Sequence, residues 1–370
     1  MEGIKAYILS KEKLIFGAAA ILLLVVAPLT LSEFRLNLLG KFLAYAIVAL
    51  GIDLIWGYTG ILSLGHGVYF GLGGYSLAMY LKLEASKGKL PDFMSWSGLT
   101  ELPLFWKPFA HSWFAIGMVI ILPVMLALIL GFLTFRSRIR GVYFSILSQA
   151  LAIIFVTLFI GQQQYTGGTN GLTDYKTIFG ISLASSVTQY YIYIITAVML
   201  GVVYLFCRWL TGARFGRVLM AIRDGENRVR FTGYDPAVYK LTVYAISAAL
   251  AGIAGALFVL QVGIVSPAMM GIVPSIEMAI WVAVGGRGSL VGAVVGALVV
   301  NAAKSSFSET FPDIWLYFIG FLFVGVVLLF PDGIMGLIKK LPGKIRVPNT
   351  RVGEGWLYGG NHTVLGKRNR

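Results

Sequence analysis

The chain has 370 residues, of which 58% are hydrophobic and only 12% are charged, whereas soluble domains carry about 25% charged residues. With a mean hydropathy of +0.82, this composition excludes a string of soluble domains and indicates a polytopic membrane protein. The net charge of +14 would point to nucleic acid in a soluble protein, but the positions of the charges here indicate no nucleic-acid partner.

The residue types that disulfides and metal sites need are scarce. Cys207 is the single cysteine, which excludes an intrachain disulfide. The three histidines, His66, His111 and His362, show no metal-ligand spacing. We therefore expect no metal site.

Apolar stretches recur along almost the whole chain, and a helix needs about 20 apolar residues to cross a bilayer. The sequence predicts an all-α transmembrane helical bundle with about ten spans. In chain order these are Leu14–Leu31, Leu38–Trp56, Leu64–Leu81, Trp113–Phe135, Val142–Gly161, Tyr190–Trp209, Leu241–Val262, Ser275–Gly285, Leu290–Asn301 and Ile314–Phe330. The eighth and ninth are short, so they are either tilted helices or a re-entrant pair.

Basic residues predict the orientation, because cytoplasmic loops carry an excess of lysine and arginine. Most of them fall before the first span, in residues 136–140, in residues 208–230 and in the tail. Ten spans place all four groups on one side, so we expect both termini in the cytoplasm. The N-terminal lysines precede no clean cleavage site, and we expect the first helix to be retained.

The predicted organisation follows from this orientation. Residues 1–13 form a cytoplasmic N-terminus, residues 14–335 the transmembrane domain and residues 336–370 a basic tail that is disordered or lies on anionic membrane lipid. Within the domain we expect a periplasmic insertion at 83–112 and a cytoplasmic loop at 211–238.

A glycine-rich segment follows the second span, with seven glycines in residues 57–74. Gly65 is one of them, and Gly67 and Gly71 have the spacing that lets helix backbones approach closely. The segment is either plain helix packing or a broken helix start that lines a pathway. His66 is accordingly either a hydrogen-bonded interfacial residue or a proton carrier.

A neutral polar stripe marks the fifth span, which begins at Val142. Helical spacing aligns Ser145 with Ser148 and Gln149, and Tyr143 precedes them. Polar side chains in a membrane usually face the bundle interior. These residues either hydrogen-bond a neutral solute or hold helices together.

Further polar candidates lie in other spans and in an outer loop. Asp53 and Glu277 fall inside spans, where a carboxylate is a functional candidate by default, although Glu277 is near enough to the end of its span to be structural. Thr166 and Asn170 stand among glycines in the loop after the fifth span, which is either an ordinary loop or an outer gate.

The loop 211–238 contains a short amphipathic helix from Arg217 to Arg223, which residues 224–227 then end. Such a helix lies on lipid or fits a groove on a soluble partner. The candidate docking residues are Arg214, Arg217, Ala221, Ile222, Arg223, Asp224, Gly225, Glu226 and Asn227. Later in the chain, Gly285, Gly286 and Gly288 surround Arg287, which fits a tight cytoplasmic turn.

Several motifs are absent. There is no G-x-x-x-x-G-K-[ST], no complete G-x-G-x-x-G, no H-E-x-x-H and no grouping of Ser, His and Asp that favours catalysis. We therefore expect a chain that is not an enzyme and that carries no cofactor of its own.

Five ordered motifs resemble the permease subunits of branched-chain amino-acid-type ABC importers. They are Gly57–Gly67 (GYTGILSLGHG), Gly141–Phe144 (GVYF) with Thr166–Leu172 (TGGTNGL), Arg214–Glu226 (RFGRVLMAIRDGE), Ser266–Pro267 and Gly285–Gly292 (GGRGSLVG). The resemblance covers roughly Leu38 to Gly336. Within the family the chain looks most like the urea-type branch, because Asp53 stands where amino-acid members commonly carry Asn and the insertion 83–112 is long.

The resemblance implies a bacterial inner-membrane permease that pairs with a second, related permease. Two cytoplasmic ATPase subunits, which bind ATP and Mg²⁺, and a periplasmic binding protein complete the importer. Residues 214–227 resemble the helix that docks into the ATPase, and the outer loops would meet the binding protein. Movement of residues 221–227 would then switch access from outside to inside.

A small neutral solute such as urea suits a path lined by hydrogen-bonding side chains. The predicted path residues are Tyr143, Ser145, Ser148, Gln149, Thr166, Asn170, Asp53 and His66. Two alternatives stay open. One is a permease for branched-chain amino acids, and the other is a stand-alone channel or secondary transporter that would have only Asp53, Glu277 and His66 for its gate or ion site.

Overall fold

The computed structural model describes residues 16–139, 141–311, 314, 317, 320–321, 324–325 and 333–340. The expectations for residues 1–13, for the tail beyond residue 340 and for most of the span Ile314–Phe330 lie outside these residues. The described chain is almost entirely helical. Its one two-stranded sheet is a hairpin of β1 (Thr177–Ile178) and β2 (Ile181–Ser182), paired antiparallel with Thr177 opposite Ser182.

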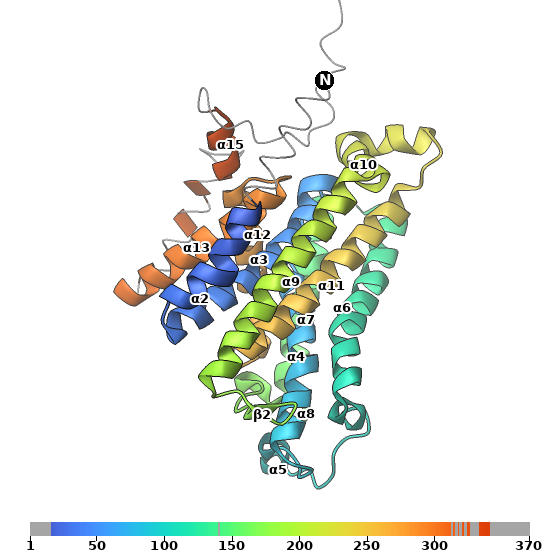
Figure 1. The fold of residues 1–370 in the computed structure, drawn as a ribbon. Helices are drawn as coiled ribbons and strands as arrows, with labels where there is room; N and C mark the ends of the chain where they lie inside the picture. The colour runs from blue at the N-terminus through green and yellow to red at the C-terminus, as the bar shows by residue number, and fades with distance from the viewer. Residues whose placement is uncertain are drawn as a thin grey trace, which may run out of the picture.

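Figure 1 shows how the elements are arranged along the chain. Besides the hairpin they are η1 (Leu22–Val26), α2 (Ala27–Thr30), α3 (Glu33–Thr59), α4 (His66–Ala85), α5 (Asp92–Trp96), η2 (Lys107–Ala110), α6 (Ser112–Arg136), α7 (Val142–Gly161), α8 (Gln163–Thr166), η3 (Gly168–Asn170), α9 (Ser186–Gly212), α10 (Arg214–Phe231), α11 (Pro236–Val262), η4 (Pro267–Met270), α12 (Ile272–Gly285), α13 (Leu290–Thr310) and α15 (Gly333–Lys340).

Six helices in the described part of the chain are long and apolar enough to cross a membrane, namely α3, α6, α7, α9, α11 and α13. The helix over residues 16–30 and α12 are apolar but shorter. The expectation of a short ninth span is wrong, because α13 continues to Thr310. Polar side chains allow this extension, since Lys304 pairs with Glu277 at 2.7 Å and the Thr310 hydroxyl donates to the Ser306 carbonyl.

The centre of the bundle is α11, which packs against α3, α4 and α6, while α9 packs against α3. In the apolar windows of α3 and α11, 78% and 72% of the residues are buried, against 22% in those of α6 and α7. Helices α3 and α11 therefore form the core. Helices α6 and α7 turn apolar side chains outward, as helices in contact with lipid do.

Glycines bring α4 and α11 into backbone contact. A Cβ on Gly73 would collide with the Gly252 backbone, and one on Gly255 would collide with the Phe70 carbonyl. The glycine-rich segment of the sequence therefore serves close helix packing.

The chain between α3 and α4 is not helical. Gly60 ends α3 with a φ of +77°, a left-handed conformation that suits glycine, and residues 60–65 then run without helix until His66 begins α4. A second interruption follows α11, where residues 263–271 contain only η4 before the 14-residue α12 starts. Irregular backbone of this kind inside a membrane protein requires hydrogen-bonding partners from the protein.

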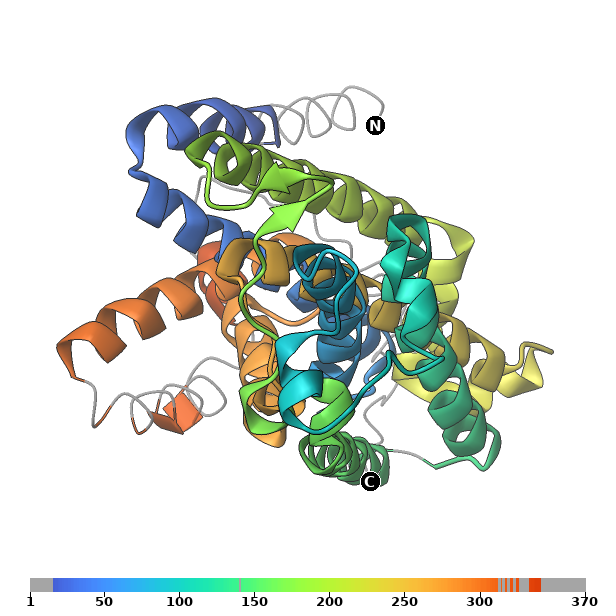
Figure 2. The ribbon, with the colours of Figure 1, turned by 90° about the horizontal axis from the view of Figure 1, so that it is seen from below.

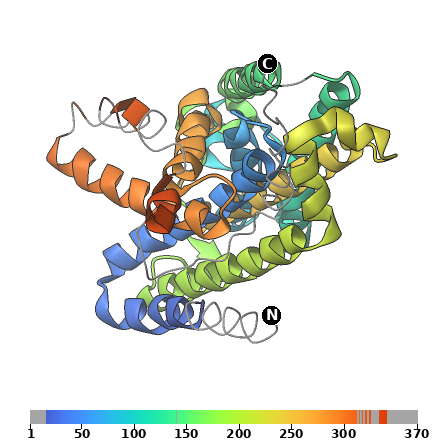
Figure 3. The ribbon, with the colours of Figure 1, turned by 90° about the horizontal axis from the view of Figure 1, so that it is seen from above.

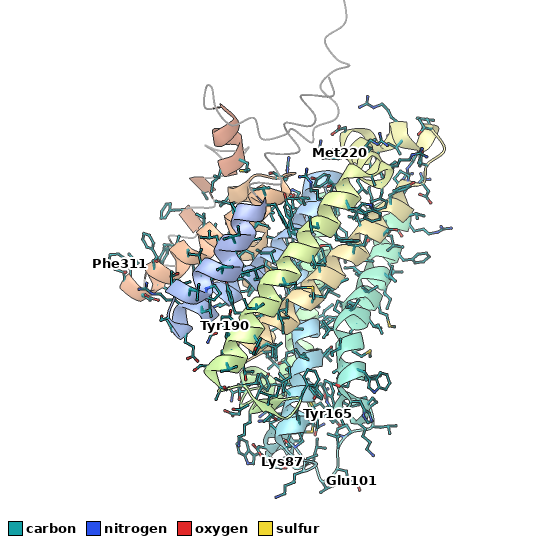
Figure 4. The ribbon with its side chains drawn as sticks, in the orientation of Figure 1. Lys87, Glu101, Tyr165, Tyr190, Met220 and Phe311 are labelled. Atoms are coloured by element: carbon teal, nitrogen blue, oxygen red, sulfur yellow. The ribbon has the colours of Figure 1, made fainter. Side chains whose placement is uncertain are left out.

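The bundle has two distinct ends, which we call the α10 end and the α5 end. Figure 3 shows α10 lying across one end, beyond the tips of the long helices. Figure 2, from the opposite side, shows α5, η2 and the loop with the hairpin covering the other end. Figure 4 places Met220 at the α10 end and Lys87, Glu101 and Tyr165 at the α5 end. Arg214, Arg217, Arg223, Arg228 and Arg230 all belong to α10, so the basic residues of the loop 211–238 gather at this end.

The insertion 83–112 folds against the α5 end. Met94, Trp106 and Phe109 are buried there, and the Trp106 indole N–H donates to the Tyr165 carbonyl at 2.9 Å. These three side chains belong to a hydrophobic cluster that also contains residues of α4, α6 and α11, so the insertion packs on the bundle.

Candidate functional site

Two serines of α7 hold the non-helical segment between α3 and α4. The Leu64 N–H donates to Ser148 Oγ at 2.9 Å, and Ser145 Oγ donates to the Leu62 carbonyl at 2.7 Å. Ser148 Oγ in turn donates to the Ser145 carbonyl at 2.8 Å. Of the two interpretations of the polar stripe, this geometry favours the one in which its serines join helices.

The remaining predicted path residues of α7 are Gln149, the third residue of the stripe, and Tyr143. Tyr143 is 75% exposed, and together with Arg138, Ile139 and Leu147 it lines a shallow hollow on the surface. Gln149 is half-buried. The exposure of Tyr143 therefore separates it from the two buried serines.

His66 opens α4 in a fully buried polar network. Its Nδ1 lies 2.9 Å from Ser63 Oγ, and its Nε2 lies 2.8 Å from Ser247 Oγ on α11. One turn along each helix, the Tyr69 and Tyr244 hydroxyls share a hydrogen bond of 2.6 Å. The network contains neutral hydroxyls and no carboxylate, so its geometry suits anchoring of α4 to α11 better than proton transfer.

A third serine, Ser275 of α12, joins the start of α4 to the helix that follows the non-helical segment 263–271. The Gly67 N–H donates to Ser275 Oγ on α12 at 3.0 Å, and a Cβ on Gly67 would collide with Ser275 and with the Met269 carbonyl. The two broken segments, residues 60–65 and residues 263–271, therefore meet at the start of α4. Gly65 and Gly71 allow close approach there to Ser148 and Met270.

Hydrogen bonds hold the loop that follows α7. The Thr166 hydroxyl donates to the Phe159 and Gln162 carbonyls, and Leu172 pairs antiparallel with Val265. The Tyr175 hydroxyl donates to the Leu172 carbonyl at 2.6 Å, and burial raises the pKa of this hydroxyl, which keeps it a donor. Asn170 is exposed beside these contacts.

Asp53 lies at the α10 end and closes the turn between α12 and α13. Its Oδ1 accepts from the Gly288 N–H at 2.7 Å, and the Arg287 guanidinium lies 5.3 Å from the Trp56 ring centroid. Gly286 and Gly288 take φ of +114° and +76°, which glycine adopts readily. The predicted tight turn at Gly285–Gly288 is present, and Asp53 serves as its hydrogen-bond acceptor.

The α10 segment differs from its prediction. The helix was expected to end at residues 224–227, but it bends at Gly225 (φ −176°, ψ 78°) and resumes to Phe231. The reason lies outside the local sequence, because Glu226 pairs with Arg230 at 2.9 Å and with Lys240 of α11 at 2.6 Å. These ion pairs hold the second part of α10 on the bundle.

The two faces of α10 are distinct. Its buried residues are Gly216, Leu219, Ile222 and Val229. Its exposed candidate docking residues are Arg214, Arg217, Ala221, Arg223, Asp224 and Asn227.

Arg223 connects α10 to the end of α3. Its Nη1 donates to the Gly57 carbonyl at 2.8 Å, while its Nε donates to Asp224. A cavity of about 210 Å³ lies beside this contact, between α10, the end of α3 and the α6–α7 loop. Thr59, Gly60 and Phe144 are among its lining residues, so α10 and the non-helical segment face the same space.

The sequence predictions did not include two lysines, Lys41 and Lys304, that lie within long apolar helices. Lys304 of α13 donates to both carboxylate oxygens of Glu277 at 2.7 and 2.9 Å, and Lys41 lies on α3 with its Nζ 5.9 Å from the Tyr45 ring centroid. A search for lysine inside apolar runs would have found Lys41. The described residues contain no group of three or more His, Cys, Asp or Glu side chains arranged to hold a metal ion.

Residues 34–327 match a protein family described as the permease component of branched-chain amino acid transport systems. The chain belongs to this permease family. The matched residues include α10, both broken segments and the turn between α12 and α13. Family membership and the long apolar helices make the permease a multi-pass protein of the inner membrane.

The permease resembles several curated relatives. It is 26% identical over 352 residues to the high-affinity branched-chain amino acid transport system permease protein LivM of Salmonella typhimurium, covering 89% of this chain and 76% of that protein. It is 25% identical over 301 residues to BraD of Pseudomonas aeruginosa, with 79% and 91% covered. The probable permease protein LivM of Methanocaldococcus jannaschii is 25% identical over 316 residues, with 79% and 90% covered. No solved structure matches the permease.

Proposed function

We propose that the permease is a membrane-spanning subunit of an ATP-driven importer for branched-chain amino acids. The match of residues 34–327 to a permease family of that transport class carries the proposal. The relatives' names give the same substrate class, both for LivM and for BraD. A second permease, two ATPase subunits and a periplasmic binding protein complete the proposed importer.

The urea-type expectation has less support than this alternative. It rested on Asp53 and on the length of the insertion 83–112. The Asp53 carboxylate binds the Gly288 N–H at the α10 end, and the insertion packs through Met94, Trp106 and Phe109. Both features have structural roles that do not depend on the substrate, so neither favours urea.

The stand-alone transporter also loses support. Two of its three candidate groups make structural contacts elsewhere in the chain: Asp53 bonds to the Gly288 N–H, and His66 bonds to two serines.

In the proposed importer, α10 receives the movement of an ATPase subunit. Its exposed polar face docks the ATPase, and its buried face holds it on the bundle. Arg223 on Gly57 and Glu226 on Lys240 would pass the movement to the end of α3 and the start of α11. Both points adjoin the non-helical segment 60–65, whose displacement would change access near the start of α4. The exposed loops of the α5 end would receive the binding protein.

Substrate-dependent ATP hydrolysis tests the proposal. The complex purified through an affinity tag on this chain is reconstituted with its binding protein, and ATP hydrolysis is measured with leucine, isoleucine, valine or urea. We expect the three amino acids to stimulate hydrolysis and urea to leave it at the basal rate. Stimulation by urea alone would replace the proposed substrate class.

A further inference from the structure

Three helices place charged side chains inside the membrane, apart from the His66 network. Glu277 of α12 pairs with Lys304 of α13. Lys41 of α3 lies over the Tyr45 ring, and Tyr45 packs on Trp281, which follows Glu277 by one turn of α12. The group has two positive charges and one negative charge, so it has one cation in excess.

The depth of these charges calls for an explanation. Lys41 lies eight residues after the start of α3, which is about 12 Å along the helix, and Lys304 lies about 9 Å before the end of α13. Their surroundings are tight, since the Lys304 and Glu277 side chains are 29% and 12% exposed. Charges within transmembrane helices are expensive and mark functional sites by default.

Two unsatisfied polar atoms flank the charges. Asn37 precedes Lys41 by one turn of α3, and Trp281 follows Glu277 by one turn of α12. Within the described residues, the buried Asn37 Oδ1 and Trp281 Nε1 have no hydrogen-bond partner. The Trp281 and Tyr45 rings pack with centroids 4.7 Å apart. The face of α3 that carries Tyr45 therefore packs against the face of α12 that carries Trp281. A buried donor and a buried acceptor beside an unbalanced charge group are what a polar ligand would satisfy.

We propose that this group, defined by Asn37, Lys41, Tyr45, Glu277, Trp281 and Lys304, binds the head group of a zwitterionic amino acid on its way through the importer. Lys41 and the Trp281 N–H would receive the carboxylate, and Glu277 and Asn37 Oδ1 the ammonium group. The inference rests on the proposed function and adds the residues that recognise the substrate.

The charge pattern favours this ligand over others. A zwitterion presents both signs of charge, as the group does, whereas a neutral solute such as urea needs hydrogen-bond partners and no charged ones. A lipid phosphate would be attracted by the lysines and repelled by Glu277.

The test uses the complete importer in proteoliposomes, with labelled leucine uptake and ATP hydrolysis measured on the same preparation. Lys41→Met is expected to reduce leucine uptake about tenfold or more, because it removes a charge-assisted hydrogen bond to the carboxylate, while stimulated ATP hydrolysis persists. Lys41→Arg, which retains the charge, is expected to restore uptake. Arg35→Met removes an exposed cation from the same helix and should leave both rates unchanged.

The outcomes separate this inference from the proposed function. Leucine uptake by Lys41→Met at the wild-type rate overturns the site and leaves the proposed substrate class intact. A parallel loss of uptake and ATP hydrolysis, or of complex assembly on size-exclusion chromatography, assigns Lys41 to subunit contact and also overturns the site. A wild-type importer that carries urea and not leucine overturns both proposals.

Discussion

Gly255 lies where α11 crosses α4, with its Cα facing the Phe70 carbonyl so closely that a Cβ would collide with it. Gly255→Ala is therefore expected to destabilise the permease by about 1–3 kcal/mol, the usual cost of overpacking. Gly201→Ala on α9 adds a Cβ where nothing lies within 4 Å and should stabilise slightly through helix propensity. Thermal unfolding in detergent measures both, and equal midpoints for the two variants would contradict this account.

Ser148 has a comparable role in hydrogen bonding, because its hydroxyl accepts from Leu64 N–H in the non-helical segment. Ser148→Ala leaves that donor unsatisfied at a cost of about 1–3 kcal/mol. The Thr242 hydroxyl bonds only to the Val238 carbonyl of its own helix and is exposed, so Thr242→Ala serves as the control. Hydrogen exchange of residues 60–65 should speed up in Ser148→Ala alone, and unchanged exchange would refute the anchoring role.

At the scale of elements, an ion pair with little exposure joins α10 to α11. The Glu226 and Lys240 side chains are 13% and 8% exposed, and removal of one partner of such a pair costs about 3–5 kcal/mol. Glu226→Gln should therefore loosen α10 and lower ATP-driven uptake more than it lowers basal ATP hydrolysis. Glu309→Gln, at the exposed end of α13, is the control. A coupled decrease of both rates would place Glu226 outside the coupling route.

The helices were largely predictable and their interruptions were not. Hydropathy belongs to each residue and to its neighbours, so α6 and α9 could be predicted to within a few residues of their ends. The continuation of α10 past Gly225 depends on Lys240, and the length of α13 depends on Glu277, both of which are distant in sequence. The segment 60–65 is held by Ser145 and Ser148, more than 80 residues away. Local patterns do not contain such contacts.

The candidate site was likewise predictable where it depends on contiguous residues and not where it depends on residues distant in the sequence. Sequence motifs identified α10 and the turn at residues 285–288, because each is a short contiguous segment. They grouped Ser145 with Gln149 and Tyr143, although Tyr143 is exposed and Ser145 binds the Leu62 carbonyl. Lys41 was missed, because its importance comes from Glu277 and Trp281 of a helix far along the chain.

At the scale of the whole molecule, the two broken segments meet at the first turn of α4, and α10 contacts the residues that precede one of them. Arg223 on Gly57 and Ser148 on Leu64 bracket the segment 60–65. In the proposed importer, a displacement of α10 would reach the centre of the bundle through these hydrogen bonds. This arrangement suits a subunit that is moved by a partner at the α10 end and exposes its pathway in response.

The central claim is that this chain carries branched-chain amino acids in an ATP-driven importer, and the accumulation of labelled leucine in sealed proteoliposomes tests it most directly. The vesicles contain the complex purified through this chain, with the binding protein outside and ATP inside, or no ATP as the control. The account predicts leucine accumulation that requires both ATP and the binding protein, with no accumulation of labelled urea. Urea accumulation without leucine, or leucine entry through this chain alone in the absence of ATPase subunits, would contradict it.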